Sequence, residues 1–186
     1  MSDVLKMNPW DKTKSFKKTV LIRYKTISEF VKEYLISENK VLDVGQPSPF
    51  TQFLTDNYQL KLDNTKGDLD EKFVIPDDNY DLIIYSHTIE HQFNPLFTLL
   101  ELKKVMKPGS IMIIAVPQRP KFLWTDHHFN EIDDYRMKLI LERAGLKIEK
   151  QKTFVIKRGF LFHISGLRRF LRLFLNKQTM YIVKNA

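Results

Sequence analysis

Residues 77–91 of the chain read DDNYDLIIYSHTIEH, and this stretch decides which fold we expect. Its centre, residues 81–85, is a short run dominated by apolar side chains, as in a parallel strand that is covered on both faces. Polar residues and two histidines follow the run directly. They are therefore predicted to lie at the carboxyl end of the strand, which is where ligands bind in open parallel sheets.

Strands and helices alternate on both sides of this stretch. Residues 41–44, which end at Gly45, and residues 111–116 predict two more buried strands. Weaker or half-exposed strands are predicted at 58–63, 146–157 and 180–183, helices at 15–36, 49–57, 94–106 and 130–144, and a loop at 67–70. The alternation predicts an α/β fold, a mostly parallel sheet with helices on both faces. We expect a single domain over residues 1–186, with a polar tail at 1–14 and a helical insertion at 158–178.

Composition excludes some classes of protein. The chain has no cysteine, so disulfides and thiolate metal sites are ruled out. No apolar run approaches the roughly 20 residues that a membrane-spanning helix needs. The lysine-rich N-terminal segment lacks the apolar centre of a signal peptide. A cytoplasmic location is therefore expected. We find no cluster of histidines and carboxylates with convincing ligand spacing, so no metal is expected either.

The net charge of +8 is concentrated at the C-terminal end. Residues 146–186 contain ten Lys or Arg and a single acid, Glu149, whereas the first 145 residues hold 20 basic and 21 acidic groups. Such asymmetry favours an anionic partner, although a solvated basic face would look the same. Residues 160–175 carry an apolar helical stripe, with Arg168, Arg169 and Arg172 off the stripe. This segment is predicted to form a lid or docking surface, and peripheral membrane contact or packing on its own domain remain open.

The order of motifs in residues 76–146 resembles a known family. After the opening stretch come Asn94-Pro95, a segment ending in Lys107-Pro108-Gly109, a strand ending at Pro117, and Arg143-Ala144-Gly145-Leu146. This series is similar to class I S-adenosylmethionine-dependent methyltransferases of the type 11 branch. The resemblance implies a Rossmann-like sheet with a final antiparallel strand, and S-adenosylmethionine as cofactor.

The resemblance also suggests which residues hold the cofactor. Residues 41–45, VLDVG, match the first motif of the family, but two further glycines that usually follow are replaced within Gln46-Pro47-Ser48-Pro49. Proline lacks an N–H donor and cannot adopt the positive φ of glycine. Either the loop takes another path and binds less tightly, or the site is inactive. Asp63 would bind the ribose, Asp68 the adenine amino group and Leu69 the ring, although residues 67–70 would equally suit a polar turn. The remaining predicted cofactor residues are Asp43, Gly45, Ser86 and His87.

Candidate acceptor residues lie beyond two strand ends. His91 and His127 are candidates for removing a proton from the acceptor, since the pKa of histidine lies near neutrality. Glu90-His91 could instead serve a structural role. Trp124 and His128 are predicted to contact the acceptor, and Arg168, Arg169 and Arg172 a phosphate on it. Residues 119–129 loosely resemble bacterial methyltransferases of surface-polysaccharide pathways.

Three functions fit the sequence. The leading one is methyl transfer to a small-molecule or glycan acceptor, which can be phosphate-bearing and belong to surface-polysaccharide biosynthesis. The second is a catalytically silent methyltransferase fold used for binding, which the altered glycine loop favours. The third is RNA methylation, which the basic C-terminal region favours. No RNA-binding module or aromatic stacking signature accompanies that region, so nucleic acid is the weaker partner.

Overall fold

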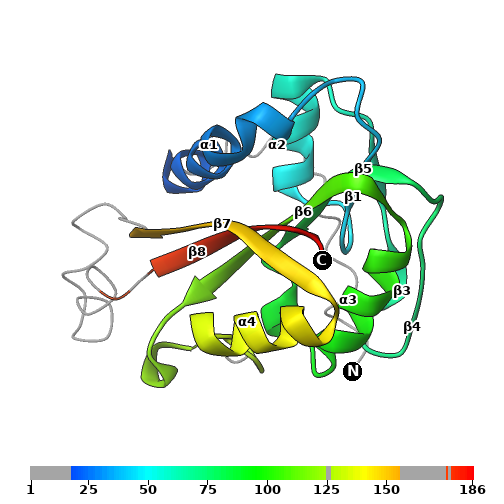
Figure 1. Cartoon of the computed structure of the whole chain (residues 1–186). Coiled ribbons are helices and arrows are strands. Elements are labelled where there is room, and N and C mark those ends of the chain that lie inside the picture. Colours follow the sequence, from blue (N-terminus) through cyan, green and yellow to red (C-terminus); the bar gives the residue numbers. More distant parts are fainter. Residues whose placement is uncertain (1–17, 125–126, 156–174, 176) are drawn as a thin grey trace.

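The computed structural model describes residues 18–124, 127–155, 175 and 177–186. At its centre is a six-stranded sheet in the order β2-β1-β5-β6-β8-β7 (Figure 1). Neighbours among the first four strands run parallel, and β8 is antiparallel to both β6 and β7. The strand bounds are β1 Val41–Asp43, β2 Leu62–Asn64, β5 Tyr80–Ser86, β6 Met106–Gln118, β7 Leu146–Val155 and β8 Lys177–Asn185. The predicted Rossmann-like fold with a final antiparallel strand is confirmed.

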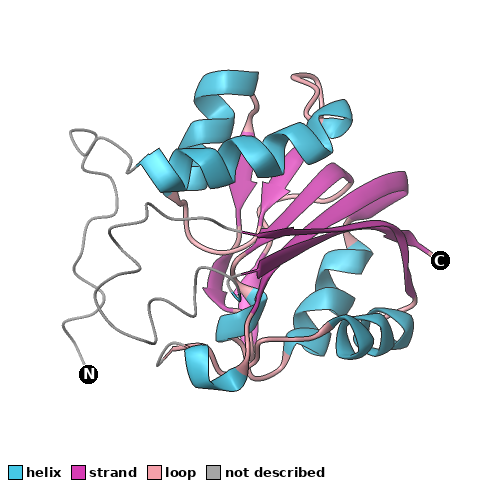
Figure 2. Ribbon diagram, turned by 90° about the vertical axis from the view of Figure 1, so that its left-hand side faces the viewer, coloured by secondary structure: helices cyan, strands magenta, loops and turns pink. Residues whose placement is uncertain are grey.

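Two helical layers cover the two faces of the sheet (Figures 1 and 2). On one face lie α1 (Lys18–Val31), the short η2 (Lys32–Tyr34) and α2 (Pro49–Tyr58), and on the other lie α3 (Pro95–Lys104) and α4 (Asp134–Arg143). Alternate residues of β5 point to opposite layers. Ile83 and Tyr85 join the core beneath α3 and α4, and Leu82 and Ile84 join the core beneath α1 and α2. The apolar run in the opening stretch is therefore buried on both faces.

Side-chain caps fix the starts of the helices that border the site. Ser48 accepts a hydrogen bond from the Thr51 N–H, and Thr51 Oγ1 accepts one from the Ser48 N–H, which forms a capping box at α2. Asn94 caps α3 by accepting a hydrogen bond from the Phe97 N–H, and Pro95 follows at the first helical position. Asp133 caps α4. The helices thus begin where short polar residues precede a helical segment.

The structure corrects several predicted boundaries. The helix expected from Asn130 begins only at Asp134, because the Asn130 N–H donates to the backbone oxygen of Glu90 and the Glu131 side chain is buried. The loop expected at 67–70 is partly a hairpin, of β3 (Lys66–Asp68) and β4 (Lys72–Val74). Strand β6 starts at Met106, within the segment expected to end a helix. Two further short helices are η3 (Ile89–His91) and η4 (Lys121–Leu123).

The predictions about chain organisation stay predictions. The tail at 1–14 lies outside the described residues, as does the insertion at 158–178 apart from residues 175, 177 and 178. Among the helices that the structure does describe, none combines the length and apolar character needed to cross a membrane.

Candidate active site

A cleft of about 380 Å³ opens at the carboxyl edge of the parallel strands. One wall comes from α1, through Arg23, Tyr24 and Ile27. The others come from residues 43–46 and 48–50, which lead from β1 into α2, and from residues 86–88 with His91 beyond β5. The cleft therefore lies at the edge where the sequence predicts ligand binding.

Asp43 closes the inner end of the cleft. Its carboxylate is buried and accepts hydrogen bonds from Thr51 Oγ1 and, at 3.4 Å, from Asn64 Nδ2. Burial raises the pKa of Asp43 to about 6, although both hydrogen bonds favour the ionised form. Asp43 therefore joins β1 to β2 and α2, and both hydrogen bonds are accepted by its Oδ2.

The loop after β1 needs glycine at one position. Gly45 has a φ of +110°, and its N–H donates to Thr65 Oγ1 at 2.8 Å. None of residues 46–49 has a positive φ. The capping box then carries the chain into α2 with Pro49 at the start of the helix. Proline at position 47 is thus compatible with the path of this loop.

Four of the seven predicted cofactor residues line the cleft, namely Asp43, Gly45, Ser86 and His87. The other three make contacts elsewhere. Asp63 accepts a 2.9 Å hydrogen bond from the Tyr80 hydroxyl, Asp68 accepts one from the Asp70 N–H, and Leu69 packs against the core beneath α3. None of the three lines the cleft, so their roles toward ribose and adenine stay predictions.

Sequence reasoning missed several residues around the cleft. Asn64 and Thr65 follow Asp63 at the end of β2 and contact the backbone of Gly45. Their position at a strand end was a signal that could have identified them. Arg23 and Tyr24 of α1 carried no such signal, since their place depends on how α1 packs across the sheet. Arg23 Nε is buried and has no hydrogen-bond partner among the described residues.

Past β5 the chain turns sharply and places His87 and Glu90 together. His87 adopts a φ of +55°, a strained value for a side chain with a Cβ. Its Nδ1 lies 3.3 Å from Glu90 Oε1, and its Nε2 lies 3.1 Å from Gln178 Oε1 on β8. Burial alone would raise the pKa of Glu90, but the contact with His87 outweighs it and the pKa is lowered. Glu90 is 1% exposed and ionised at neutral pH.

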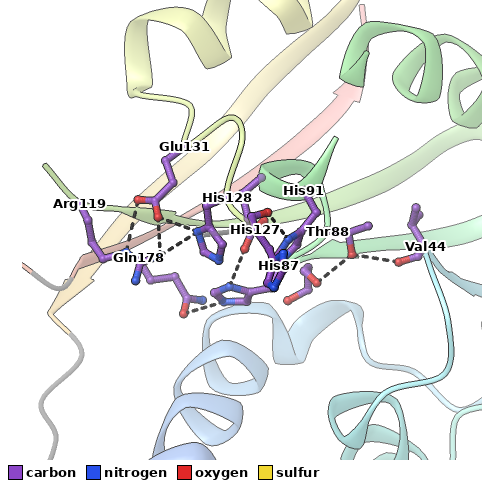
Figure 3. A network of polar contacts seen from close by, with 11 residues as sticks. Val44, His87, Thr88, His91, Arg119, His127, His128, Glu131 and Gln178 are labelled. Atoms are coloured by element: carbon purple, nitrogen blue, oxygen red, sulfur yellow. Dashed lines mark hydrogen bonds and ion pairs between the residues drawn. The ribbon is translucent and has the colours of Figure 1, made fainter. Parts of the chain in front are cut away.

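His91 and His128 meet beside this pair (Figure 3). Their ring centres are 4.8 Å apart with nearly perpendicular planes. His91 Nδ1 lies 2.8 Å from the backbone oxygen of His127, whose own side chain is exposed. His128 Nδ1 lies 2.6 Å from Glu131 Oε1, and Glu131 also pairs with Arg119. Burial lowers the pKa of His128, so its ring is neutral at pH 7.

The loop after β6 thus brings together residues that the sequence analysis treated separately. Glu90, His91 and His128 each offer a potential ligand atom, and these atoms lie within 4.8 Å of one another. The sequence showed no convincing ligand spacing for this group, because His128 approaches Glu90 and His91 only through the folding of this loop. Whether a metal is needed is not tested.

The remaining predicted acceptor residues have mixed outcomes. Trp124 is half-buried, and its indole N–H donates to the backbone oxygen of Arg119, which braces the loop before His127 and His128. Arg168, Arg169 and Arg172 lie outside the described residues.

A second cavity, of about 490 Å³, adjoins the loop after β6. It is lined by Arg119, Glu131 and residues 132–135, with neighbours on β6 and β8.

Comparison with known proteins identifies the fold and matches part of the chain to a family. Residues 41–114 match a protein family described as a methyltransferase domain. A search of curated protein sequences found no match.

Solved structures that resemble the chain include S-adenosylmethionine-dependent methyltransferases from Archaeoglobus fulgidus, Clostridium acetobutylicum and Mesorhizobium loti. Their TM-scores are 0.60, 0.58 and 0.58 at identities of 18%, 11% and 10%. The alignments cover 89%, 87% and 89% of this chain, and 93%, 89% and 98% of the respective relatives. The match of residues 41–114 to a methyltransferase domain, together with the fold, supports a class I S-adenosylmethionine-dependent methyltransferase with S-adenosylmethionine as cofactor.

Proposed function

We propose that the protein transfers the methyl group of S-adenosylmethionine to a hydroxyl of a small-molecule or glycan acceptor. The observation that carries this proposal is the position of the histidine cluster between two cavities. His91 lines the cofactor cleft and contacts His128, whose partner Glu131 lines the 490 Å³ cavity. A polar cluster at such a boundary suits the point where acceptor and methyl donor meet.

The cleft offers the contacts that S-adenosylmethionine requires. Arg23 supplies a cation with a buried Nε, which suits the carboxylate of the methionine part. Gly45 lets the backbone approach the ligand closely, since it carries no side chain. Residues 86–88 and His91 form the far wall, next to the histidine cluster.

Methyl transfer is an in-line displacement at the carbon bound to the sulfonium. The new O–C bond forms as the S–C bond breaks, and the acceptor hydroxyl must also lose its proton. His91 and the groups around it are placed to orient this hydroxyl and to promote the loss of its proton. His127 contributes through its backbone oxygen, which holds His91 in place.

A direct assay tests the proposal. Transfer of labelled methyl groups would be measured with sugar nucleotides, lipid-linked glycans, phenolic small molecules and RNA as acceptors. We expect transfer to one of the first three classes, and a loss of about 100-fold or more in His91→Gln. Exchange of the exposed Lys121 for Gln is the control and should leave the rate unchanged. Binding of S-adenosylhomocysteine without transfer to any acceptor would favour the silent alternative, and transfer to RNA alone would favour the third function.

The acceptor class can be narrowed through the basic C-terminal region. If a phosphate-bearing glycan carrier is the acceptor, replacing Arg168, Arg169 and Arg172 with Gln should weaken its binding and reduce the salt dependence, because charged contacts to phosphate are lost. Affinity for S-adenosylmethionine should not change. Sedimentation with anionic liposomes tests peripheral membrane contact through residues 160–175 separately. No change in either measurement would identify the arginines as a solvated face.

A further inference from the structure

We propose that Glu90, His91 and His128 bind a divalent transition-metal ion such as Zn²⁺ at the acceptor side of the cofactor cleft. Two imidazoles and one carboxylate form a donor set that suits zinc and its neighbours in the first transition row. The three potential ligand atoms lie within 4.8 Å of one another. Figure 3 shows His91 and His128 side by side, with His87 next to them.

Glu90 supplies the first argument. Its side chain is 1% exposed, and Oε1 contacts His87. Oε2 is buried and has no hydrogen-bond partner among the described residues. No lysine or arginine in that part of the chain forms an ion pair with Glu90. A buried carboxylate oxygen without a donor is costly, and a cation bound at that oxygen would remove the cost.

The tautomers of the two histidines supply the second argument. The atom opposite His91 Nδ1 is a backbone oxygen, which can only accept, so Nδ1 must carry the proton. The atom closest to His128 Nδ1 is a carboxylate oxygen of Glu131, at 2.6 Å, and this contact favours the proton on Nδ1, whereas the donor Arg119 Nη2, at 2.8 Å, favours the other tautomer. With the proton on Nδ1, Nε2 of each ring carries the lone pair that can bind a metal. Metal-binding histidines are commonly held in this way, by a carboxylate or a backbone oxygen on the other ring nitrogen.

Arg119 lies close to this cluster, and its charge is already compensated. Its Nη2 lies 2.8 Å from His128 Nδ1. The same guanidinium forms an ion pair with Glu131, in which both side chains are nearly buried. Arg119 therefore reaches His128 because both groups share the Glu131 carboxylate. The negative charge of Glu90 remains for the metal.

Three protein ligands leave coordination positions open, as in catalytic zinc sites. If the proposed function holds, the acceptor hydroxyl would bind at an open position, and the cation would lower the pKa of that hydroxyl. The metal ion would then stabilise the deprotonated oxygen of the acceptor at the edge of the cofactor cleft. Metal binding itself does not depend on this step.

Metal binding can be measured without knowing the acceptor. Protein freed of metal with a chelator would be titrated with Zn²⁺ by calorimetry and with Co²⁺ by visible absorption. We expect one ion per chain and a tetrahedral-type Co²⁺ spectrum. His91→Gln and His128→Gln should each weaken metal binding at least tenfold. Loss of a residue that only holds a metal ligand in place already weakens metal binding by about 10-fold or more. Lys121→Gln is the control, because Lys121 is exposed, lies in the same loop after β6 and is not part of the cluster.

Circular dichroism and titration with S-adenosylhomocysteine would be run on every variant. Failure of the wild type to bind either ion, or equal binding by the wild type and all three variants, would overturn the metal site. If S-adenosylhomocysteine binds normally in those cases, the cofactor cleft stands and only the metal inference falls. Should metal bind while S-adenosylhomocysteine does not, the metal site stands and the proposed methyl transfer fails.

Discussion

At the level of single residues, the cleft is built around one buried acid, Asp43. Its carboxylate joins the end of β1 to Thr51 of α2 and Asn64 of β2. Because burial raises its pKa to about 6, against 3.8 for the unperturbed group, the folded protein binds a proton there more tightly than the unfolded chain does. Asp43 therefore contributes less stability as the pH rises from about 4 to about 6.

The variant Asp43→Asn tests this linkage. The amide has nearly the same shape and carries no charge, so the decrease in stability between pH 4 and pH 6 should become smaller than in the wild type. Above pH 6 the free energy of unfolding should rise by up to about 3 kcal/mol, which is the equivalent of two pKa units. Urea unfolding at several pH values measures both effects. A variant with the pH dependence of the wild type would show that Asp43 is not the group responsible.

Within the protein itself, position 45 requires glycine because of its backbone conformation and not because a side chain would clash with its neighbours. A Cβ built at this position would meet Thr88 only at 3.6 Å, an ordinary contact, but its φ of +110° is unfavourable for any other residue. Gly45→Ala should therefore lower the free energy of unfolding by about 1–3 kcal/mol and weaken S-adenosylhomocysteine binding. Gly109→Ala is the matched control, since Gly109 has a φ of +80° in open space away from the cleft. It should lose stability without losing affinity in calorimetry.

At the level of elements, the start of α2 links helix stability to the cleft. Ser48 caps this helix and lines the cleft, whereas Asn94 caps α3 on the opposite face of the sheet. Ser48→Ala and Asn94→Ala should each cost about 1 kcal/mol in denaturant unfolding. Only Ser48→Ala should weaken S-adenosylhomocysteine binding, because the first turn of α2 forms a wall of the cleft. Equal affinities in the two variants would contradict a role for this cap in the site.

The predictable elements are those whose signals are local. The runs at 41–44 and 81–85 predict buried strands because most of their side chains are apolar. Ser48-Pro49 and Asn94-Pro95 mark helix starts by their own side chains. The start of α4 was misplaced because Asn130 donates to a residue 40 positions earlier. The hairpin β3–β4 was missed because its short, exposed strands have no apolar pattern.

The same distinction applies to the site. Four residues could be placed at the cleft because each ends or directly follows a recognisable strand: Asp43, Gly45, Ser86 and His87. The cluster of Glu90 with His128 depends on the long loop after β6 folding back, and the place of Arg23 depends on the packing of α1. Contacts between segments that are far apart in the sequence produce no recognisable pattern of residue spacing.

At the level of the whole molecule, part of the C-terminal basic charge is paired within the fold. Lys150 on β7 lies 2.5 Å from Glu33 of η2, and Lys184 on β8 lies 2.8 Å from Glu149 on β7. Both pairs are exposed, so each contributes little to stability. Lys150 and Lys184 are thus already paired within the fold. The positive charge that β7 and β8 offer to a partner is therefore smaller than the count of basic residues after position 146 suggests.

The two apolar cores share their strands, and this predicts how the molecule unfolds. Met112 and Ile114 of β6 face the core under α3 and α4, while their neighbours Ile111 and Ile113 face the core under α1 and α2. Loss of either layer would expose one face of the strands that also hold the other core, so unfolding should be a single cooperative transition. Calorimetry should give equal calorimetric and van't Hoff enthalpies, with circular dichroism and fluorescence transitions at the same temperature.

Ligand binding at the strand edge should then stabilise the whole fold. S-adenosylhomocysteine at 100 times its Kd adds about 2.7 kcal/mol, which corresponds to a rise in Tm of roughly 5–10 °C for a domain of this size. All optical signals should shift together, because the cleft is formed by β1, β5, α1 and α2 and these strands lie in both cores. Two separate transitions, only one of which moves with ligand, would mean that the helical layers unfold independently and that the shared sheet does not couple them.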